Sequence, residues 1–289
     1  MTQDKIVIGI RGCIFSPWDK QWKECMDTWG AVMESQGYNL KVLMGHPELK
    51  EDYIELDRFL FSKSTETRYG VFYKHIYYPC KWFLNETNYD HIYIVGDDTF
   101  VHPQKFFSLY EGMRNHLDFN ANGGPHYWGA ATPRLQNWGR NVKDFRQNFK
   151  EAILYLSGGS GMVLSRKAAQ VIVESFESGE WAKWEKPGIQ FEGFPEFTIP
   201  QMETSQEWLY MDDLLTGLIL YKNHIWLTHD DAFSFESPFK PQIGPFYPGM
   251  EKHIPYIGGK NGEHLVAQHF VAGKMHEIMD FLDLWKEIK

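Results

Sequence analysis

The sequence predicts an α/β fold in which a mostly parallel, twisted sheet is flanked by helices. Two observations support this. Residues 6–10, 19–34 and 38–44 have the patterns of strand, helix and strand, which together form a βαβ unit. The same alternation recurs before a second apolar strand, residues 91–95. Since no repeat or clear boundary divides the 289 residues, we expect one domain over 1–289.

The elements expected in the first half of the chain are as follows. The strand at 6–10 ends at Arg11, which either holds a diphosphate or pairs with a surface acid. A helix capped by Ser64 or Thr65 and kinked near Pro79 leads into the strand at 91–95. No strand is expected between the strand at 38–44 and this helix.

The second half continues the pattern less regularly. Pro103 begins a helix over 103–116, and Ser165 caps a helix over 166–177. Further elements are expected as strands at 127–130, 162–165 and 225–227, and as helices at 208–222 and near the C-terminus. Three loops are expected to shape the recognition of an acceptor, and they are 45–63, 131–150 and 179–206.

Composition restricts the possible functions. The net charge of −9 argues against nucleic acid as a partner, although a divalent cation could still neutralise a nucleotide's phosphates. Aromatic residues make up 16% and serve either as core or as sugar platforms. Three cysteines without metal-ligand spacing indicate a reducing compartment, and no apolar run approaches the ~18 residues of a membrane span. We therefore expect a soluble intracellular protein.

Two adjacent aspartates follow the strand at 91–95, in the segment Gly96-Asp97-Asp98-Thr99. Carboxylates at a strand end cost folding energy unless a cation or a hydrogen-bond donor meets them. In open α/β sheets, ligands bind beyond the carboxyl ends of the strands. These residues alone leave two interpretations open, an ordinary turn and a metal site.

Two other segments carry candidate functional residues. Gly158-Gly159-Ser160-Gly161 allows a close approach of backbone to ligand, or forms a tight turn between core strands. It is not a phosphate-binding loop, because it leads into a strand and lacks the Lys-Ser/Thr pair. Asp212 and Asp213 begin an apolar helix, where an acid is at least a partner of the helix dipole, worth ~0.3–1 kcal/mol.

Five segments in this order resemble the Fringe-like and β1,3-galactosyltransferase family of inverting GT-A glycosyltransferases. The resemblance extends from Ile6 to about Met279. The segments are Asp27-Thr28-Trp29, Gly96 to Val101, Tyr127-Trp128-Gly129, Gly158 to Ser165, and Asp212-Asp213-Leu214 with Thr216-Gly217. The resemblance implies a GT-A fold with a donor-binding half over about 1–115 and an acceptor and catalytic half over about 116–289.

The resemblance also implies roles for individual residues. Asp98 matches the family's metal-binding aspartate, for Mn²⁺ or Mg²⁺, and His269 its C-terminal histidine ligand, with His229 as the alternative. Asp213 matches the catalytic base, with Asp212 as the alternative. The expected donor or substrate contacts are Arg11, Asp97, Trp128, Gly158, Gly159, Ser160 and Gly161. Gly96 replaces the family's first acid, which orients the nucleotide's sugar, and this departure puts the donor preference in doubt.

The function implied is metal-dependent, inverting transfer of a sugar from a nucleotide-sugar, a UDP-sugar by resemblance, to a hydroxyl of a glycan or glycoprotein. The family's usual members are membrane-anchored and disulfide-bonded, and this chain shows neither feature, which favours either a soluble form of microbial or viral origin or a trimmed form of a longer protein. Two alternatives remain: a non-catalytic carbohydrate-binding protein, and a metal-dependent nucleotidyltransferase or pyrophosphohydrolase.

Overall fold

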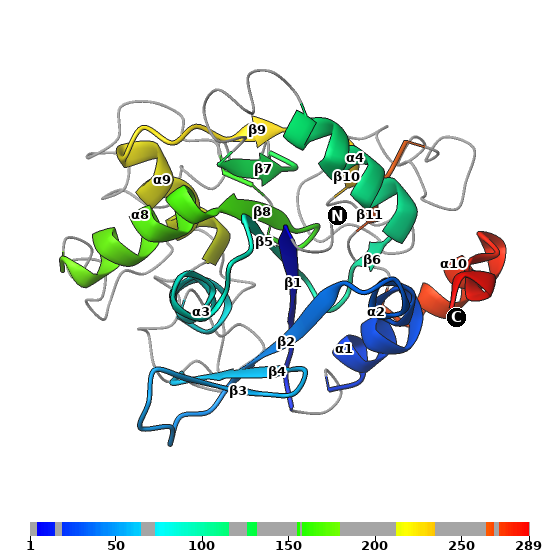
Figure 1. Cartoon of the computed structure of the whole chain (residues 1–289), viewed down its shortest axis with the longest axis horizontal. Coiled ribbons are helices and arrows are strands. Elements are labelled where there is room, and N and C mark those ends of the chain that lie inside the picture. The colour runs from blue at the N-terminus through cyan, green and yellow to red at the C-terminus, as the bar shows by residue number, and fades with distance from the viewer. Residues whose placement is uncertain are drawn as a thin grey trace, which may run out of the picture.

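The computed structural model describes residues 5–14, 19–64, 73–115, 126–131, 155–156, 158–179, 212–234, 264–268 and 272–288. Within them the chain forms a mixed α/β structure around an eight-stranded sheet (Figure 1). The strands, in spatial order, are β3 (Tyr53–Leu56), β4 (Phe59–Ser62), β2 (Asn39–Gly45), β1 (Ile6–Arg11), β5 (His91–Val95), β8 (Met162–Ser165), β7 (Tyr127–Gly129) and β9 (Thr228–His229). A smaller sheet has the order β10 (Phe233–Ser234), β11 (Ala267–Gln268) and β6 (Phe100–Val101).

The large sheet is mostly parallel. Strand β1 lies at its centre and pairs in parallel with β2 and β5, and every described residue of β5 is buried. Only β3 and β8 run against the other strands. The carboxyl ends of the remaining six strands therefore meet at one edge, which we call the carboxyl edge. The predicted α/β class is confirmed, and the sheet takes strands from both predicted halves; the single domain stays a prediction.

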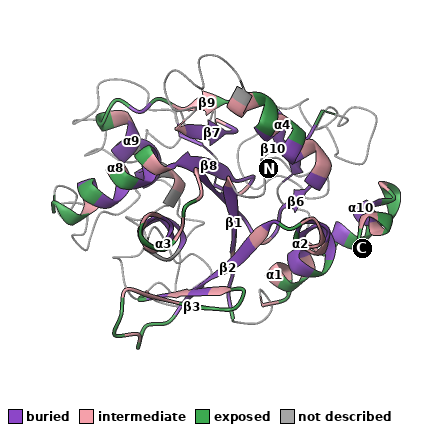
Figure 2. Ribbon diagram, viewed as in Figure 1, coloured by how far each residue is buried: buried purple, intermediate pink, exposed green. Residues whose placement is uncertain are grey.

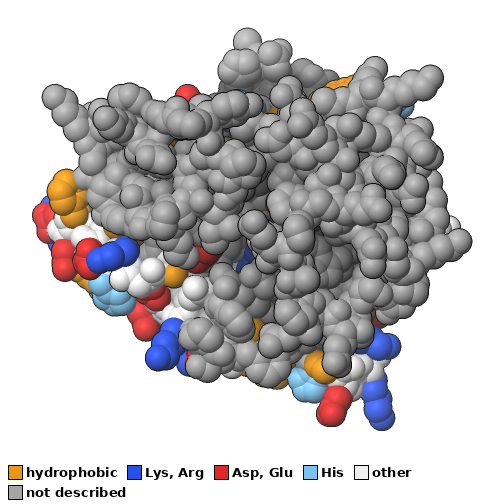
Figure 3. Space-filling view, turned by 180° about the vertical axis from the view of Figure 1, so that it is seen from behind, with side chains coloured by type: hydrophobic (Ala, Val, Ile, Leu, Met, Phe, Trp, Pro, Cys, Tyr) orange, Lys and Arg blue, Asp and Glu red, His pale blue; other side chains and the backbone are white. Residues whose placement is uncertain are grey.

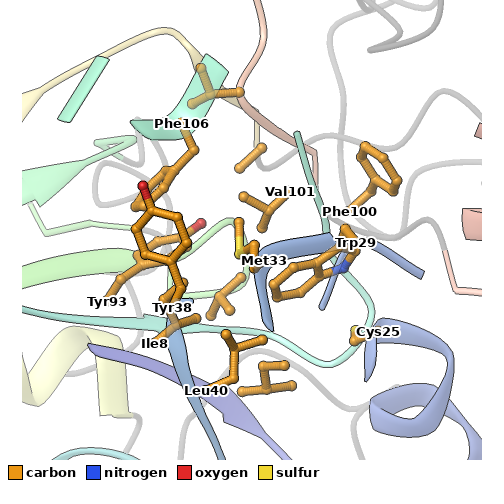
Figure 4. Packing of buried hydrophobic residues seen from close by; sticks show 14 of the residues in the cluster. Ile8, Cys25, Trp29, Met33, Tyr38, Leu40, Tyr93, Phe100, Val101 and Phe106 are labelled. Atoms are coloured by element: carbon orange, nitrogen blue, oxygen red, sulfur yellow. The ribbon is translucent and has the colours of Figure 1, made fainter. Parts of the chain in front are cut away.

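Helices cover both faces of the sheet (Figures 1 and 2). One face packs against α1 (Asp19–Cys25), η2 (Met26–Gly30), α2 (Ala31–Ser35), α4 (Pro103–Asn115), α10 (Met275–Phe281) and η9 (Leu284–Glu287). The other packs against η3 (Tyr73–Tyr77), α3 (Tyr78–Glu86), α8 (Arg166–Glu177) and α9 (Asp212–Lys222). Each face buries its own apolar cluster, and Figure 4 shows part of the first, with Trp29, Met33 and Phe100 among its members.

Several sequence predictions need correction. The predicted helix over 19–34 is interrupted, because Thr28 leaves helical geometry at φ −113° and ψ −109°. Residues 53–62 form the β3–β4 hairpin, where no strand was expected. The strand predicted at 225–227 is instead observed at residues 228–229, as β9. Pro79 lies in the first turn of α3, directly after the irregular η3 segment. The cap expected at Ser64 or Thr65 stays a prediction, because residues 65–72 lie outside the described residues.

The described part of the back face carries acidic and basic side chains close together (Figure 3). Ion pairs between described side chains include Lys274 with Glu277 (2.6 Å) and Lys81 with Asp52 (2.7 Å). Exposed pairs of this kind contribute only ~0–1 kcal/mol each. We therefore attribute the stability of the fold mainly to the two apolar clusters.

Arg166 joins α8 to the C-terminal end of α3. Its guanidinium donates to four main-chain carbonyls at 2.7–3.3 Å, namely those of Phe83, Leu84, Thr87 and Tyr89. The carbonyl of Phe83 also accepts the hydroxyl of Thr87 at 2.7 Å, and Arg166 adds to the bonds that satisfy main-chain carbonyls where the helix ends.

We expect Arg166→Met to lower the free energy of unfolding by about 2–3 kcal/mol, because charge-assisted bonds to several carbonyls are lost at once. Urea denaturation of the wild type and of the variant measures the loss. Lys167→Met, at the exposed neighbouring residue, is the control and should change stability by less than about 0.5 kcal/mol. Equal effects of the two substitutions would contradict a capping role for Arg166.

His91 makes stability depend on pH. Its side chain is buried at the start of β5, and its Nδ1 lies 2.8 Å from the hydroxyl of Tyr110. Loss of solvation lowers the pKa of His91 to about 4, against a smaller opposing effect of Asp90. The unfolded chain takes up this proton near pH 6.5 and the folded chain only near 4, so stability falls as the pH drops through this window.

From this residue alone we expect a loss of about 2 kcal/mol between pH 7.5 and pH 5. Denaturant unfolding at both pH values measures it in the wild type and in His91→Asn, which cannot titrate there. The variant should lose correspondingly less stability on acidification. The buried His102, whose pKa desolvation also lowers to about 4, titrates in both proteins and so cancels in the comparison. An identical loss in the two proteins would show that His91 is protonated in the folded state.

Candidate functional site

The carboxyl edge of the large sheet gathers most of the predicted site residues. Arg11 ends β1, Asp97 and Asp98 follow β5, and the turn at 158–161 precedes β8. Because β8 runs antiparallel to β5, the segment before β8 lies at the same edge as the segment after β5. Segments far apart in the sequence therefore meet where open α/β sheets bind ligands.

The two aspartates lie in a turn that we call the acidic turn, Gly96 to Thr99. The main-chain N–H of Thr99 donates to the carbonyl of Gly96 at 3.2 Å. The side chain of Asp98 is buried, with 5% exposure, and Asp97 is half-buried. A buried carboxylate at the end of a strand favours a bound cation or hydrogen-bond donors.

The acidic turn packs directly on residues 158–161, which we call the glycine turn. The carbonyl of Gly159 accepts the main-chain N–H of Gly96 at 3.0 Å and the hydroxyl of Thr99 at 2.7 Å. A β-carbon at Gly96 would lie 2.9 Å from that carbonyl oxygen and 3.0 Å from Oδ1 of Asp98. Gly96 is thus needed for this packing, and any larger residue would displace the glycine turn.

The glycine turn also contacts two charged side chains. A β-carbon at Gly158 would overlap Nη2 of Arg11 and lie 2.9 Å from its Nη1, so the guanidinium lies directly against this glycine. The main-chain N–H of Gly158 donates to Oδ2 of Asp213 at 3.5 Å, a long hydrogen bond. Arg11 and Asp213, more than 200 positions apart, therefore meet at one residue.

The remaining residues of the glycine turn are fixed by the core. The hydroxyl of Tyr93, a buried residue of β5, donates to the carbonyl of Ser160 at 2.8 Å. Gly161 adopts a φ of +97°, and a β-carbon there would fall within the ring of Tyr93. Glycine is required here for both its conformation and its size.

Helix α9 brings Asp213 to the carboxyl edge. Its apolar residues, including Leu215 and Ile219, are buried in the second cluster and anchor the helix against the sheet. Asp213 lies in the first turn and is half-buried. The side chain of Asp212 is outside the described residues, so the choice between the two acids as the base stays open structurally.

Cys25 and Trp29 support the acidic turn from the helix side. The Cys25 thiol donates to the carbonyl of Asp97 at 3.1 Å, and the Trp29 indole donates to the carbonyl of Thr99 at 3.0 Å. Burial, together with the charges of Asp97 and Asp98, holds the pKa of Cys25 well above its usual range, so the thiol keeps its proton. Sequence reasoning gave neither residue a role, although Trp29 belongs to one of the five matching segments.

Trp128 is the penultimate residue of β7 and belongs to the first apolar cluster. Its ring is buried and packs edge-on against Phe233, with ring centroids 5.0 Å apart, and its Nε1 donates to Asp230 at 3.1 Å. A direct contact of Trp128 with a donor stays a prediction, and its observed contacts are those of a core residue.

The structure describes one of the two candidate histidine ligands, His229. His229 ends β9, where its Nδ1 accepts the main-chain N–H of Ala131 at 3.0 Å. Three strand spacings of ~4.8 Å, or roughly 14 Å, separate it from Ile94 of β5 across the paired strands. That spacing is long for two ligands of one ion. His269 lies outside the described residues.

The chemistry of the acidic turn fits a hard divalent cation. Asp98 provides carboxylate oxygens, and Mn²⁺ and Mg²⁺ prefer oxygen ligands while keeping waters and phosphate oxygens in their shell. Among the described residues, no group of three or more His, Cys, Asp or Glu could hold a metal by itself.

Comparisons with known proteins give limited guidance. No family model matches the chain, and no curated protein matches it. It is similar to a crystal structure of a glycosyltransferase involved in the glycosylation of the major capsid of PBCV-1, with 10% sequence identity, a TM-score of 0.44, and coverage of 96% of this chain and 99% of that chain. Similarity at this level identifies neither a family nor an activity.

Within the described ranges, no helix is both long enough and apolar enough to cross a bilayer.

Proposed function

We propose that this protein is a metal-dependent, inverting glycosyltransferase that moves a sugar from a nucleotide-sugar, with UDP as the favoured nucleotide, to a hydroxyl of a glycan or glycoprotein. One observation carries the proposal. The acidic turn, Arg11 and Asp213 all meet at the glycine turn, on the edge of the sheet where α/β folds bind ligands. This arrangement combines a candidate cation site, a fixed positive charge and a carboxylate base.

Asp213 is suited to the role of base. Inversion requires a group that accepts the proton of the acceptor hydroxyl as its oxygen attacks the anomeric carbon opposite the leaving diphosphate. The hydrogen bond from Gly158 orients one carboxylate oxygen of Asp213, Oδ2. The half-buried position keeps the carboxylate within reach of a ligand at the carboxyl edge.

Arg11 and Asp98 are suited to the diphosphate. A guanidinium presents a planar fork of N–H groups that matches phosphate oxygens. Asp98, with a second ligand proposed at His269, would hold Mn²⁺ or Mg²⁺, which when bound stabilises the charge that develops on the leaving diphosphate. Support for His269 comes from its neighbour: Gln268 pairs with Phe100, two residues after Asp98.

Gly96 changes what can contact the donor. The contacts at Gly96 leave no room for a carboxylate at this position. If the nucleotide's sugar is bound as in the resembling family, its contacts must come from elsewhere in the site. We therefore propose UDP-sugars as the first donors to test, together with other nucleotide sugars.

Product analysis tests the proposal. The protein is incubated with Mn²⁺, a panel of nucleotide sugars and simple glycoside acceptors, and the nucleotide products are separated. A glycosyltransferase releases the nucleoside diphosphate, whereas a pyrophosphohydrolase releases the monophosphate and a sugar phosphate. Asp98→Asn should abolish release. Monophosphate as the product would overturn the proposal in favour of the hydrolase, and no release from any donor would favour a binding protein.

A further inference from the structure

The carbonyls on either side of Asp98 are held by one helical segment. Asp97 accepts the thiol of Cys25 and Thr99 accepts the indole N–H of Trp29, at 3.1 and 3.0 Å. Both donors have no exposed surface, so water does not compete for these bonds. Cys25 ends α1 and Trp29 lies in η2, on either side of the interruption at Thr28, and both side chains reach the acidic turn.

The acidic turn is also held from the opposite side. There the carbonyl of Gly159 accepts the hydroxyl of Thr99 and the main-chain N–H of Gly96. The peptide groups around Asp98 are therefore fixed by the helix on one side and by the glycine turn on the other. A carboxylate on a turn that is fixed in this way keeps its direction without a ligand, so less order has to be created when a cation binds.

We propose that Trp29 and Cys25 are positioning residues for Asp98: by bonding the two carbonyls that flank it, they set the direction of its carboxylate and so the affinity of the site for a divalent cation. This inference rests on the proposed function, in which Asp98 is a metal ligand. Groups that orient metal ligands typically change metal affinity by 10–100-fold when they are removed.

Manganese binding, measured from the electron paramagnetic resonance signal of free Mn²⁺ in the presence of UDP, tests the role of Trp29. Trp29→Phe removes the indole N–H and keeps an aromatic ring. Trp82→Phe is the matched control, since Trp82 is as deeply buried and donates its indole N–H to Glu55 at 2.9 Å, on the other face of the sheet. We expect Trp29→Phe to weaken Mn²⁺ binding roughly ten-fold and Trp82→Phe to leave it unchanged, although both lower the melting temperature.

A second pair of variants keeps the inference testable if Trp29→Phe does not fold. Cys25→Ala removes the donor to Asp97, whereas Cys25→Ser retains a donor in the same place. The serine variant should recover most of the Mn²⁺ affinity that the alanine variant loses. If the wild type binds Mn²⁺ and neither substitution site affects it, the inference is wrong and the proposed function stands. If the wild type with UDP binds no Mn²⁺, the proposed metal site fails and the inference fails with it.

Discussion

Replacing Asp213 with asparagine should lower the rate constant for glycosyl transfer by ~10²–10⁴, the contribution of a general base. The amide cannot take up the acceptor's proton at neutral pH. It keeps an oxygen that can accept the N–H of Gly158, so the glycine turn should keep its shape. Donor affinity should change by less than about two-fold, because the base acts on the acceptor. Steady-state kinetics and calorimetric donor binding measure the two effects separately.

Asp212→Asn is the matched control, since it makes the same chemical change one residue earlier. It should keep most of the activity. If Asp212→Asn is inactive and Asp213→Asn is active, the two roles are exchanged. If both are active, the base is not at the start of α9, and the proposed mechanism must be abandoned.

Replacing Gly161 with alanine should destabilise the fold by at least about 3 kcal/mol. The residue has a φ of +97°, which costs an L-amino acid ~1–2 kcal/mol, and the added methyl group would overlap the buried ring of Tyr93. Tyr93 also holds the carbonyl of Ser160, so movement of the ring would disturb the glycine turn. Urea unfolding gives the loss of stability, and donor binding at low temperature shows whether the site is also lost.

Alanine substitutions at two other glycines separate the conformational cost of a positive φ from the steric cost of the added methyl group. Gly179 has a φ of +75° with nothing within 4 Å of an added β-carbon, so its alanine variant should lose only the conformational part, ~1 kcal/mol. Gly112 lies within α4, also with open space, and its alanine variant should gain ~0.5–1 kcal/mol. A Gly161→Ala variant as stable as Gly179→Ala would contradict the packing against Tyr93.

The sheet could be predicted from the sequence because its central strands are continuous apolar runs. Residues 6–10 and 91–95 are unambiguous as strands, but the order of the βαβ units does not specify that they lie side by side. The β3–β4 hairpin was missed because its strands are short and lie at the sheet's edge, with polar residues such as Glu55. Asp57, in the turn with a φ of 52°, was a local signal for this hairpin that the prediction did not use.

The candidate site was predicted less completely. The acidic turn and the glycine turn stand out as short motifs, but a sequence does not show that Gly159 bonds both Gly96 and Thr99. The role of Gly96 is a question of space, which only a structure can answer. Trp29 and Cys25 look like ordinary apolar helix residues, and their polar atoms become informative only once their partners are known.

A thermal-shift panel of nucleotide sugars, each with and without Mn²⁺, tests the central claim most directly. A ligand that binds only the folded state stabilises it by RT ln(1 + [L]/Kd), so a true donor at millimolar concentration should raise the melting temperature. We predict that one nucleotide class does so, that the shift requires the metal, and that Asp98→Asn removes it. If no nucleotide sugar shifts the melting temperature with Mn²⁺ present, the carboxyl edge is not a donor site and the glycosyltransferase proposal is contradicted.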